Sequence, residues 1–333
     1  MVSLFIGTIE LFQDIKFKYI QRFISLLLIL VVFILFSFNK ENNDYLAYLE
    51  IFELESKVEN GYIYLIKVIK MIKGSHQYIV FIIGLVLVFY LLFRFLKKTR
   101  YPVLILFLYF QNNFIYDLNQ IRNTLSYILI LYALEYLIKN QNKKYLLLNF
   151  LAISFQRVGI IYLFFFILSK FEMKKYYKIL LFISSIGIFL LPIFKIILLK
   201  LFPDKASVYF ATKISKGYLL YYILFLLDLI ILKITNSFDI KSKEDEILLK
   251  FILFPVIFLP GGMLSIDLVS RPYRNALLIK WLFIFKKIED QKILNRVLVA
   301  ILCVLGAVFP SIVTYYKNSG EWLKLINYLQ KII

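Results

Sequence analysis

Long apolar segments alternate with short polar ones along the whole chain. A helix needs about 20 residues to cross the hydrocarbon core of a bilayer, and most of these segments approach that length. The pattern predicts an all-α polytopic integral membrane protein with about ten transmembrane helices. The expected spans cover residues 23–38, 78–96, 102–116, 121–138, 145–169, 177–201, 218–232, 248–266, 276–285 and 297–315.

Composition supports this class and narrows the chemistry. Apolar residues make up 61% of the chain and charged residues only 18%, with a mean hydropathy of +0.79, which excludes a soluble globular protein. The spans leave room for little else, so residues 1–333 are expected to form a single membrane domain. One cysteine and one histidine exclude a disulfide framework and a His/Cys metal site.

Forty Lys and Arg against 21 Asp and Glu give a net charge of +19. In so apolar a chain these groups belong at membrane interfaces or in a wet cavity, and they require no nucleic acid. Short loops rich in Lys and Arg face the cytoplasm, which fixes the orientation. Two such clusters are Arg94, Lys97, Lys98 and Arg100, and Lys139, Lys143 and Lys144.

The segment 145–169 does not fit this orientation as a single crossing. A basic cluster follows at residues 170–178, and one ordinary span would place it outside. The conflict disappears if the segment is a broken pair of short helices that enters the membrane and returns, with its tip at Gln156 and Arg157. The topology then closes with the N-terminus inside and the C-terminus outside.

Two segments are expected to lie on the membrane surface. Residues 39–77 form the largest loop and face outward, and their apolar and aromatic residues predict one or two interfacial helices. The C-terminal segment 317–333 alternates apolar and charged residues and predicts another interfacial helix.

A polar stripe opens the fourth span. Asn119, Arg122, Asn123 and Ser126 follow the spacing i, i+3, i+4, i+7 and would share one face of a helix. The helix N-terminus and the Arg122 guanidinium would together favour a phosphate. The alternative is an arginine that reaches the interface beside a polar helix–helix contact.

Arg271 and Arg274 form a second basic pair, just before the ninth span. Pro272 predicts that Arg271 lies in a loop or in a first helical turn. Paired guanidinium groups suit a diphosphate, although they would also suit lipid headgroups at the interface. Arg157, beside Gln156, is a further cation, and Lys213 and Lys216 lie in an outward loop that an anionic lipid substrate would stabilise.

Two ionisable residues have a simpler interpretation. Asp228 interrupts an apolar run, and pairing with a basic side chain is favoured over a proton relay. His76 lies at a membrane boundary, where an interface residue is favoured over a catalytic one.

Several short motifs, in their order among the spans, resemble the EpsG family, relatives of the Wzy-type bacterial polysaccharide polymerases. Members usually carry His where this chain has Gln156, so the resemblance leaves open which group would act in its place. The motifs are Asp44-Tyr45 with Tyr48, Glu59-Asn60-Gly61-Tyr62, Ile121-Arg122-Asn123-Thr124-Leu125, residues 152–161, and Ser270-Arg271 with Tyr273.

The resemblance implies a glycosyltransferase of surface polysaccharide (capsule, exopolysaccharide or O-antigen) in the bacterial cytoplasmic membrane. It would transfer a glycan from undecaprenyl diphosphate to a lipid-linked repeat unit at the outer face, without a cofactor or metal. A chain-length regulator and a flippase of the same pathway are expected partners. A flippase or transporter, or a ligase, of lipid-linked oligosaccharide are the alternative functions.

In this scheme the expected site residues divide by role. The diphosphates would be bound by Arg122, Arg271, Arg274 and Arg157. Asp44 or Glu59 would deprotonate the acceptor or orient sugar hydroxyls, unless they only cap loops. Further substrate contacts are expected from Asn119, Asn123, Gln156, Lys213 and Lys216.

Overall fold

The computed structural model describes residue 10 and residues 18–40, 44–55, 58–92, 99–201 and 218–317. This part of the chain contains 14 α-helices and three 3-10 helices, which confirms the all-helical class. Lys213, Lys216 and the expected C-terminal interfacial helix lie outside it, apart from Lys317. The chain divides into two compact units, Met1–Phe164 with Lys292–Ile333 (unit 1) and Phe165–Gln291 (unit 2). Each is described by itself.

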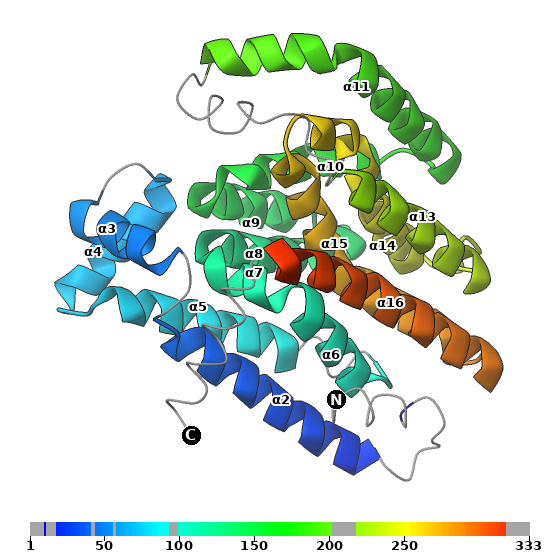
Figure 1. The fold of residues 1–333 in the computed structure, drawn as a ribbon, viewed down its shortest axis with the longest axis horizontal. Coiled ribbons are helices and arrows are strands. Elements are labelled where there is room, and N and C mark those ends of the chain that lie inside the picture. Colours follow the sequence, from blue (N-terminus) through cyan, green and yellow to red (C-terminus); the bar gives the residue numbers. More distant parts are fainter. Residues whose placement is uncertain are drawn as a thin grey trace. The chain divides into compact units, whose positions relative to one another are not determined.

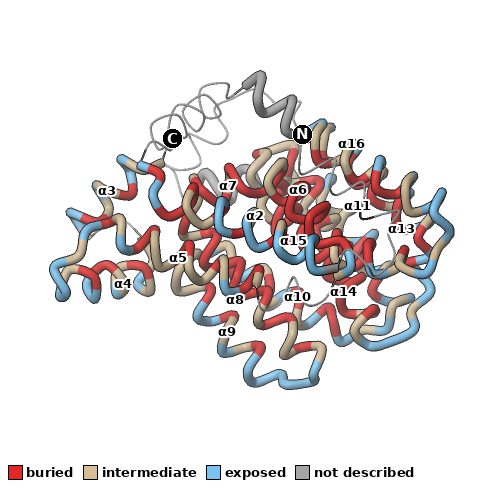
Figure 2. Tube along the Cα trace, turned by 90° about the horizontal axis from the view of Figure 1, so that it is seen from below, coloured by how far each residue is buried: buried red, intermediate tan, exposed pale blue. Residues whose placement is uncertain are grey.

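Helix α8 is the centre of unit 1. It packs against α5, α7 and α9, and most of its residues are buried (Figures 1 and 2). Helix α2 packs on α5 and α6, and α16 packs on α6. The helices of unit 1 are α2 (Lys18–Phe38), α3 (Tyr45–Leu54), α4 (Asn60–Met71), α5 (His76–Tyr90), α6 (Pro102–Asn112), α7 (Phe114–Asn119), α8 (Ile121–Ile138), α9 (Asn142–Phe155) and α16 (Ile293–Lys317).

The expected break in segment 145–169 is present. Helix α9 ends at Phe155, Gln156 has an extended backbone (φ −153°, ψ 118°), and a 3-10 turn η3 (Arg157–Ile160) leads into α10 (Ile161–Ser169). The Tyr145 hydroxyl donates to the Tyr162 carbonyl at 2.7 Å, whereas 17 residues of straight helix would span about 25 Å. The chain therefore reverses at the polar pair, as predicted; its entry into a membrane stays a prediction.

The segment 39–77 contains two helices, α3 and α4, in agreement with the expected one or two. In Figure 1 they lie beyond the first turn of α5, and α4 meets α5 at a bend of 117°. Whether they rest on a membrane surface stays a prediction.

Four described helical segments are long and apolar enough to cross a membrane: Tyr19–Phe38, Ile121–Ile138, Lys243–Met263 and Ile293–Pro310. The bent pair α4–α5 raises this number to five. Several other expected spans form shorter or broken helices, such as α6 and α7 in the region 102–116. A polytopic arrangement is supported, and the number of ten spans stays a prediction.

Large apolar side chains are exposed along several of these helices. Phe23 and Leu26 on α2, Leu147 on α9, Phe189 on α11 and Leu305 on α16 are all exposed. Water would disfavour so much apolar surface, whereas lipid tails would cover it. The exposed faces are therefore those expected of a membrane protein.

Unit 2 is built around α15. This helix packs against α13, α14 and two 3-10 segments, and α11 packs against the same 3-10 segments. The elements of unit 2 are α11 (Met173–Leu201), α13 (Tyr218–Ile234), α14 (Lys243–Leu253), η4 (Phe254–Phe258), η5 (Pro260–Met263) and α15 (Ile266–Ile288).

The expected position of Arg271, in a loop or first turn, is wrong. Helix α15 begins at Ile266, so Arg271 and Pro272 lie inside it. Pro272 is the seventh residue of α15, beyond the first turn, so it removes one backbone hydrogen bond within the helix. Asp267 in the first turn also favours this early start, because a carboxylate is stabilised near a helix N-terminus.

Asp228 is paired within unit 2, as favoured by its position in an apolar run. Its carboxylate accepts a hydrogen bond from the Lys280 ammonium at 2.6 Å and from the Tyr273 hydroxyl at 2.8 Å. All three side chains are buried. The network ties α13 to α15 and satisfies both charges.

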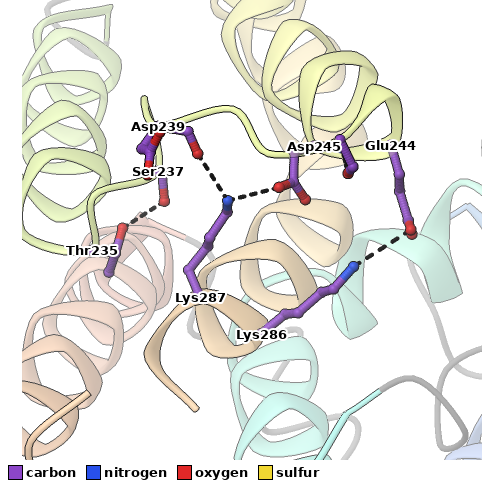
Figure 3. A network of polar contacts seen from close by, with 8 residues as sticks. Thr235, Ser237, Asp239, Glu244, Asp245, Lys286 and Lys287 are labelled. Atoms are coloured by element: carbon purple, nitrogen blue, oxygen red, sulfur yellow. Dashed lines mark hydrogen bonds and ion pairs between the residues drawn. The ribbon is translucent and has the colours of Figure 1, made fainter. Parts of the chain in front are cut away.

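A second network joins the loop before α14 and the first turn of α14 to the last turn of α15 (Figure 3). Lys287 donates to the Asp239 carbonyl at 3.2 Å and to the Asp245 carboxylate at 2.8 Å. Lys286 lies 3.4 Å from the Glu244 carboxylate. These lysines also complement the negative end of the α15 dipole.

Replacing Lys280 with Met should destabilise the protein strongly, because the buried Asp228 carboxyl would lose its cation. Breaking a buried pair from one side costs about 3–5 kcal/mol. The measurement is the free energy of unfolding of purified protein in detergent. The double variant Asp228→Asn with Lys280→Met keeps an acceptor for Tyr273 and should recover most of the loss; a double variant no more stable than the single one would contradict this account.

Candidate functional site

Glu59 connects three elements of unit 1. It occupies the N-cap position of α4 with an extended backbone (φ −66°, ψ 144°). One carboxylate oxygen, Oε2, accepts a hydrogen bond from Arg122 of α8. The other, Oε1, accepts one from the Arg157 backbone N–H at 3.2 Å and lies 4.0 Å from Arg157 Nε. Helix α4, helix α8 and the α9–α10 break therefore meet at one carboxylate.

A break at Gln120 places Arg122 in the first turn of α8. Gln120 (φ −104°, ψ 57°) separates α7 from α8, and the Thr124 hydroxyl donates to the Asp117 carbonyl across the junction at 2.9 Å. The prediction of one continuous stripe is therefore wrong for Asn119, which ends α7. Asn123 and Ser126 remain on α8 with Arg122, and both are buried.

Two tyrosines pack around the Arg122 guanidinium. Its Cζ lies 5.6 Å from the Tyr48 ring centre and 5.8 Å from that of Tyr62, which is cation–π geometry. The Arg122 side chain is 20% exposed, and its buried Nε–H has no hydrogen-bond partner among the described residues. The guanidinium is thus fixed by its neighbours while one donor is unused.

Tyr48 remains a neutral phenol at physiological pH. Burial raises the pKa of Tyr48 above its usual value, although the adjacent Arg122 partly opposes that rise. Its hydroxyl is therefore available as a hydrogen-bond donor next to the arginine.

Gly61 allows α4 to reach the helix break. A Cβ atom at this position would lie 2.3 Å from Ser154 Oγ and 2.7 Å from the Ser154 carbonyl oxygen. Both distances are far below van der Waals contact, so only glycine fits here without a shift of the backbone. The close approach places Glu59, two residues earlier, within reach of Arg157.

The other expected residues of unit 1 differ in their position and in how far they are exposed. Asp44 occupies the N-cap position of α3 and acts electrostatically on Tyr48. Gln156 lies in the break, and its buried Oε1 has no partner within the described structure. The Arg157 side chain is 75% exposed, so its guanidinium is accessible to a ligand.

Arg271 and Arg274 belong to unit 2. Arg271 Nη2 lies 3.7 Å from the Asp267 carboxylate, and its side chain is 20% exposed. Arg274 is buried, and its Nε donates to the Ser270 carbonyl at 3.4 Å. A single site that combines these arginines with Arg122 stays a prediction.

Two aromatic neighbours of Arg122 received no role in the sequence analysis. Tyr48 and Tyr62 occur in the motifs that resemble the family, yet their contact with Arg122 depends on tertiary packing. His76 is buried in an aromatic cluster with Tyr48, and its place at a membrane boundary stays a prediction. For the site around Arg122, the only sequence signal was the group of polar residues at the start of an otherwise apolar helix.

The unit 1 cluster can bind an anion. Two guanidinium groups share one carboxylate, which leaves an excess of positive charge in a partly buried setting. The first turn of α8 adds backbone N–H groups at the positive end of a helix dipole. A phosphate or diphosphate has the charge and the acceptor oxygens that such a site favours.

In a comparison with protein families, residues 22–329 match the EpsG family. No curated protein matches the chain. No solved structure matches it.

Gly61→Ala should separate α4 from the break, because the added methyl group meets the Ser154 backbone. We expect a loss of about 1–3 kcal/mol in the free energy of unfolding, as for other overpacked positions. Thermal unfolding of purified protein in detergent measures it. Gly261→Ala is the matched control, since its nearest neighbour would lie at an ordinary 3.4 Å; equal stability of the two variants would contradict the predicted close contact.

Proposed function

Because the chain belongs to the EpsG family of exopolysaccharide-biosynthesis membrane proteins, we propose that it is a Wzy-like polysaccharide polymerase. It transfers a growing glycan from undecaprenyl diphosphate to the sugar of a lipid-linked repeat unit. The reaction takes place at the outer face of the bacterial cytoplasmic membrane. A flippase and a chain-length regulator of the same pathway are its proposed partners.

The observation that carries this proposal is the Glu59 carboxylate held between Arg122 and Arg157. Its geometry fixes Arg122, while the exposed Arg157 guanidinium extends toward solvent or substrate. Both cations would approach the diphosphate of a lipid-linked glycan. The lipid tail would remain in the bilayer beside the apolar faces of the helices.

The chemistry requires stabilisation of negative charge. An oxygen of the acceptor sugar attacks the anomeric carbon, and the bond from that carbon to the diphosphate oxygen breaks. The electron pair of this bond leaves with the diphosphate, whose negative charge therefore increases. Cations already positioned at that oxygen lower the barrier, because they need no reorganisation as the charge develops.

Glu59 has a positioning role in this proposal. It orients Arg122 by a charge-assisted hydrogen bond and draws the helix break toward α8. Asp44, at the start of α3, is the carboxylate assigned to the sugar hydroxyls. Gln156 and Asn123 are assigned to neutral contacts with the sugar. Asn119, Lys213 and Lys216 are assigned to substrate binding without a more specific role.

Arg271 and Arg274 have the same chemical character in unit 2 and are assigned to a diphosphate as well. The pairing of Arg271 with Asp267 is long, at 3.7 Å, so a phosphate oxygen would compete with that carboxylate. Replacement of Arg271 by Ala is therefore expected to shorten the glycan.

Arg122→Ala should stop glycan elongation, because the leaving diphosphate loses its buried cation. Loss of one preorganised donor costs about 100- to 1,000-fold in rate. Arg122→Lys should fail as well, since an ammonium group cannot keep the planar contact with Glu59 and both tyrosines. Surface-glycan length on a gel measures the effect in a deletion strain complemented with each variant.

Lys67→Ala is the matched control, because it removes an exposed cation from α4 without touching the cluster; it should restore the full ladder. A full ladder from Arg122→Ala would remove this residue from the mechanism.

Product length also separates the alternative functions. A ligase would move a finished chain, and loss of a flippase would leave lipid-linked single units on the inner face.

A further inference from the structure

His76 is the only histidine of the chain, and it is the first residue of α5. Its side chain is surrounded by aromatic rings of α3. Tyr48 stacks on the imidazole with 6.2 Å between ring centres and an angle of 11°. The rings of Tyr45 and Phe52 approach it edge-on at 5.3 Å and 6.1 Å. His76 is only 1% exposed.

This environment does not satisfy an imidazole. Neither ring nitrogen of His76 has a hydrogen-bond partner among the described residues. A buried polar atom without a partner destabilises the folded state. Phenylalanine would fill the same cluster without that cost, so packing does not explain the presence of histidine. Violations of this kind are expected where a side chain has a chemical role.

Tyr48 links His76 to the unit 1 cluster of Glu59, Arg122 and Arg157. One side chain stacks on the imidazole and also lies under the guanidinium of Arg122, 5.6 Å from its Cζ. The single histidine is therefore one aromatic ring away from the arginine assigned to the leaving group. A glycosyl transfer needs both kinds of group close together: a cation for the diphosphate and a proton acceptor for the attacking hydroxyl.

We propose that His76 is the proton acceptor of the transfer reaction. This inference rests on the proposed function. As the acceptor oxygen forms its bond to the anomeric carbon, its proton moves to a nitrogen of the neutral imidazole. The bond from the anomeric carbon to the diphosphate breaks, and the diphosphate leaves with the electron pair. His76 then releases the proton to water and is ready for the next acceptor.

Side chains of helix α3 cover both groups. All three rings packed on the imidazole belong to α3, and Tyr48 also covers Arg122. Besides these buried ring contacts, two partly exposed polar contacts hold this segment: Tyr45 donates to Gln77 at 3.3 Å, and Lys70 contacts Glu55, just after α3, at 2.9 Å. Displacement of α3 by an entering acceptor would expose the imidazole and the guanidinium together.

His76→Phe separates a chemical role from a packing role. The ring fits the aromatic cluster and removes both unpaired nitrogens, so the midpoint temperature of unfolding should stay equal to wild type or rise. Glycan elongation should nevertheless fall by about 100-fold or more, the usual contribution of a general base. The two readouts are thermal unfolding of purified protein and ladder length in the complemented deletion strain. A stable His76→Phe protein that restores the full ladder would overturn the proposal.

Phe52→Leu is the matched control. It loosens the same cluster but keeps the imidazole, so it should lower the midpoint temperature and still restore the ladder. His76→Gln is a second test in case the Phe variant fails to fold; it retains polarity but accepts no proton at neutral pH, and elongation by this variant would also overturn the proposal.

The ladder of the deletion strain, without and with complementation, distinguishes failure of this inference from failure of the proposed function. If deletion leaves the ladder unchanged, the polymerase function itself fails. If deletion removes the ladder while wild type and a folded His76→Phe both restore it, the polymerase function stands and only the role of His76 fails.

Discussion

The carboxylate of Glu59 is the contact on which the unit 1 site depends. It binds Arg122 and the backbone of Arg157, and so holds α4, α8 and the α9–α10 break together. Its side chain is 13% exposed, so solvent screens the contact with Arg122 only weakly. Loss of one partner of a buried pair costs about 3–5 kcal/mol; the value is smaller here because both side chains are partly exposed, Arg122 by 20% and Glu59 by 13%. Without Glu59, the Arg122 guanidinium and the Arg157 backbone N–H would lose the acceptor that they share.

Local sequence signals were sufficient for much of the fold. The expected span 121–138 coincides with α8, and the predicted break at Gln156 and Arg157 is present. The helix follows from an apolar run. The break follows from the basic cluster at residues 170–178, which a single crossing would place outside, and the polar pair marks its position. The two helices of the outer loop were also predicted from their apolar residues. EpsG membership agrees with the resemblance based on short motifs.

The remaining features depend on contacts between distant segments. Glu59 and Arg122 are 63 positions apart, and Asp228 and Lys280 are 52 apart; a sequence shows that such charges need partners without showing which ones. The break at Gln120, which separates Asn119 from Arg122, lacks a proline or glycine to mark it. Pro272 was taken as a helix boundary, yet α15 begins before it. The burial of His76 by α3 follows from tertiary packing alone.

Reconstitution tests the central claim most directly. Purified protein in lipid vesicles would receive lipid-linked repeat units extracted from the deletion strain, with no other protein present. The account predicts glycans of several repeats on one lipid, together with one released undecaprenyl diphosphate for each bond formed. Repeat units that stay single in the presence of folded wild-type protein would contradict it.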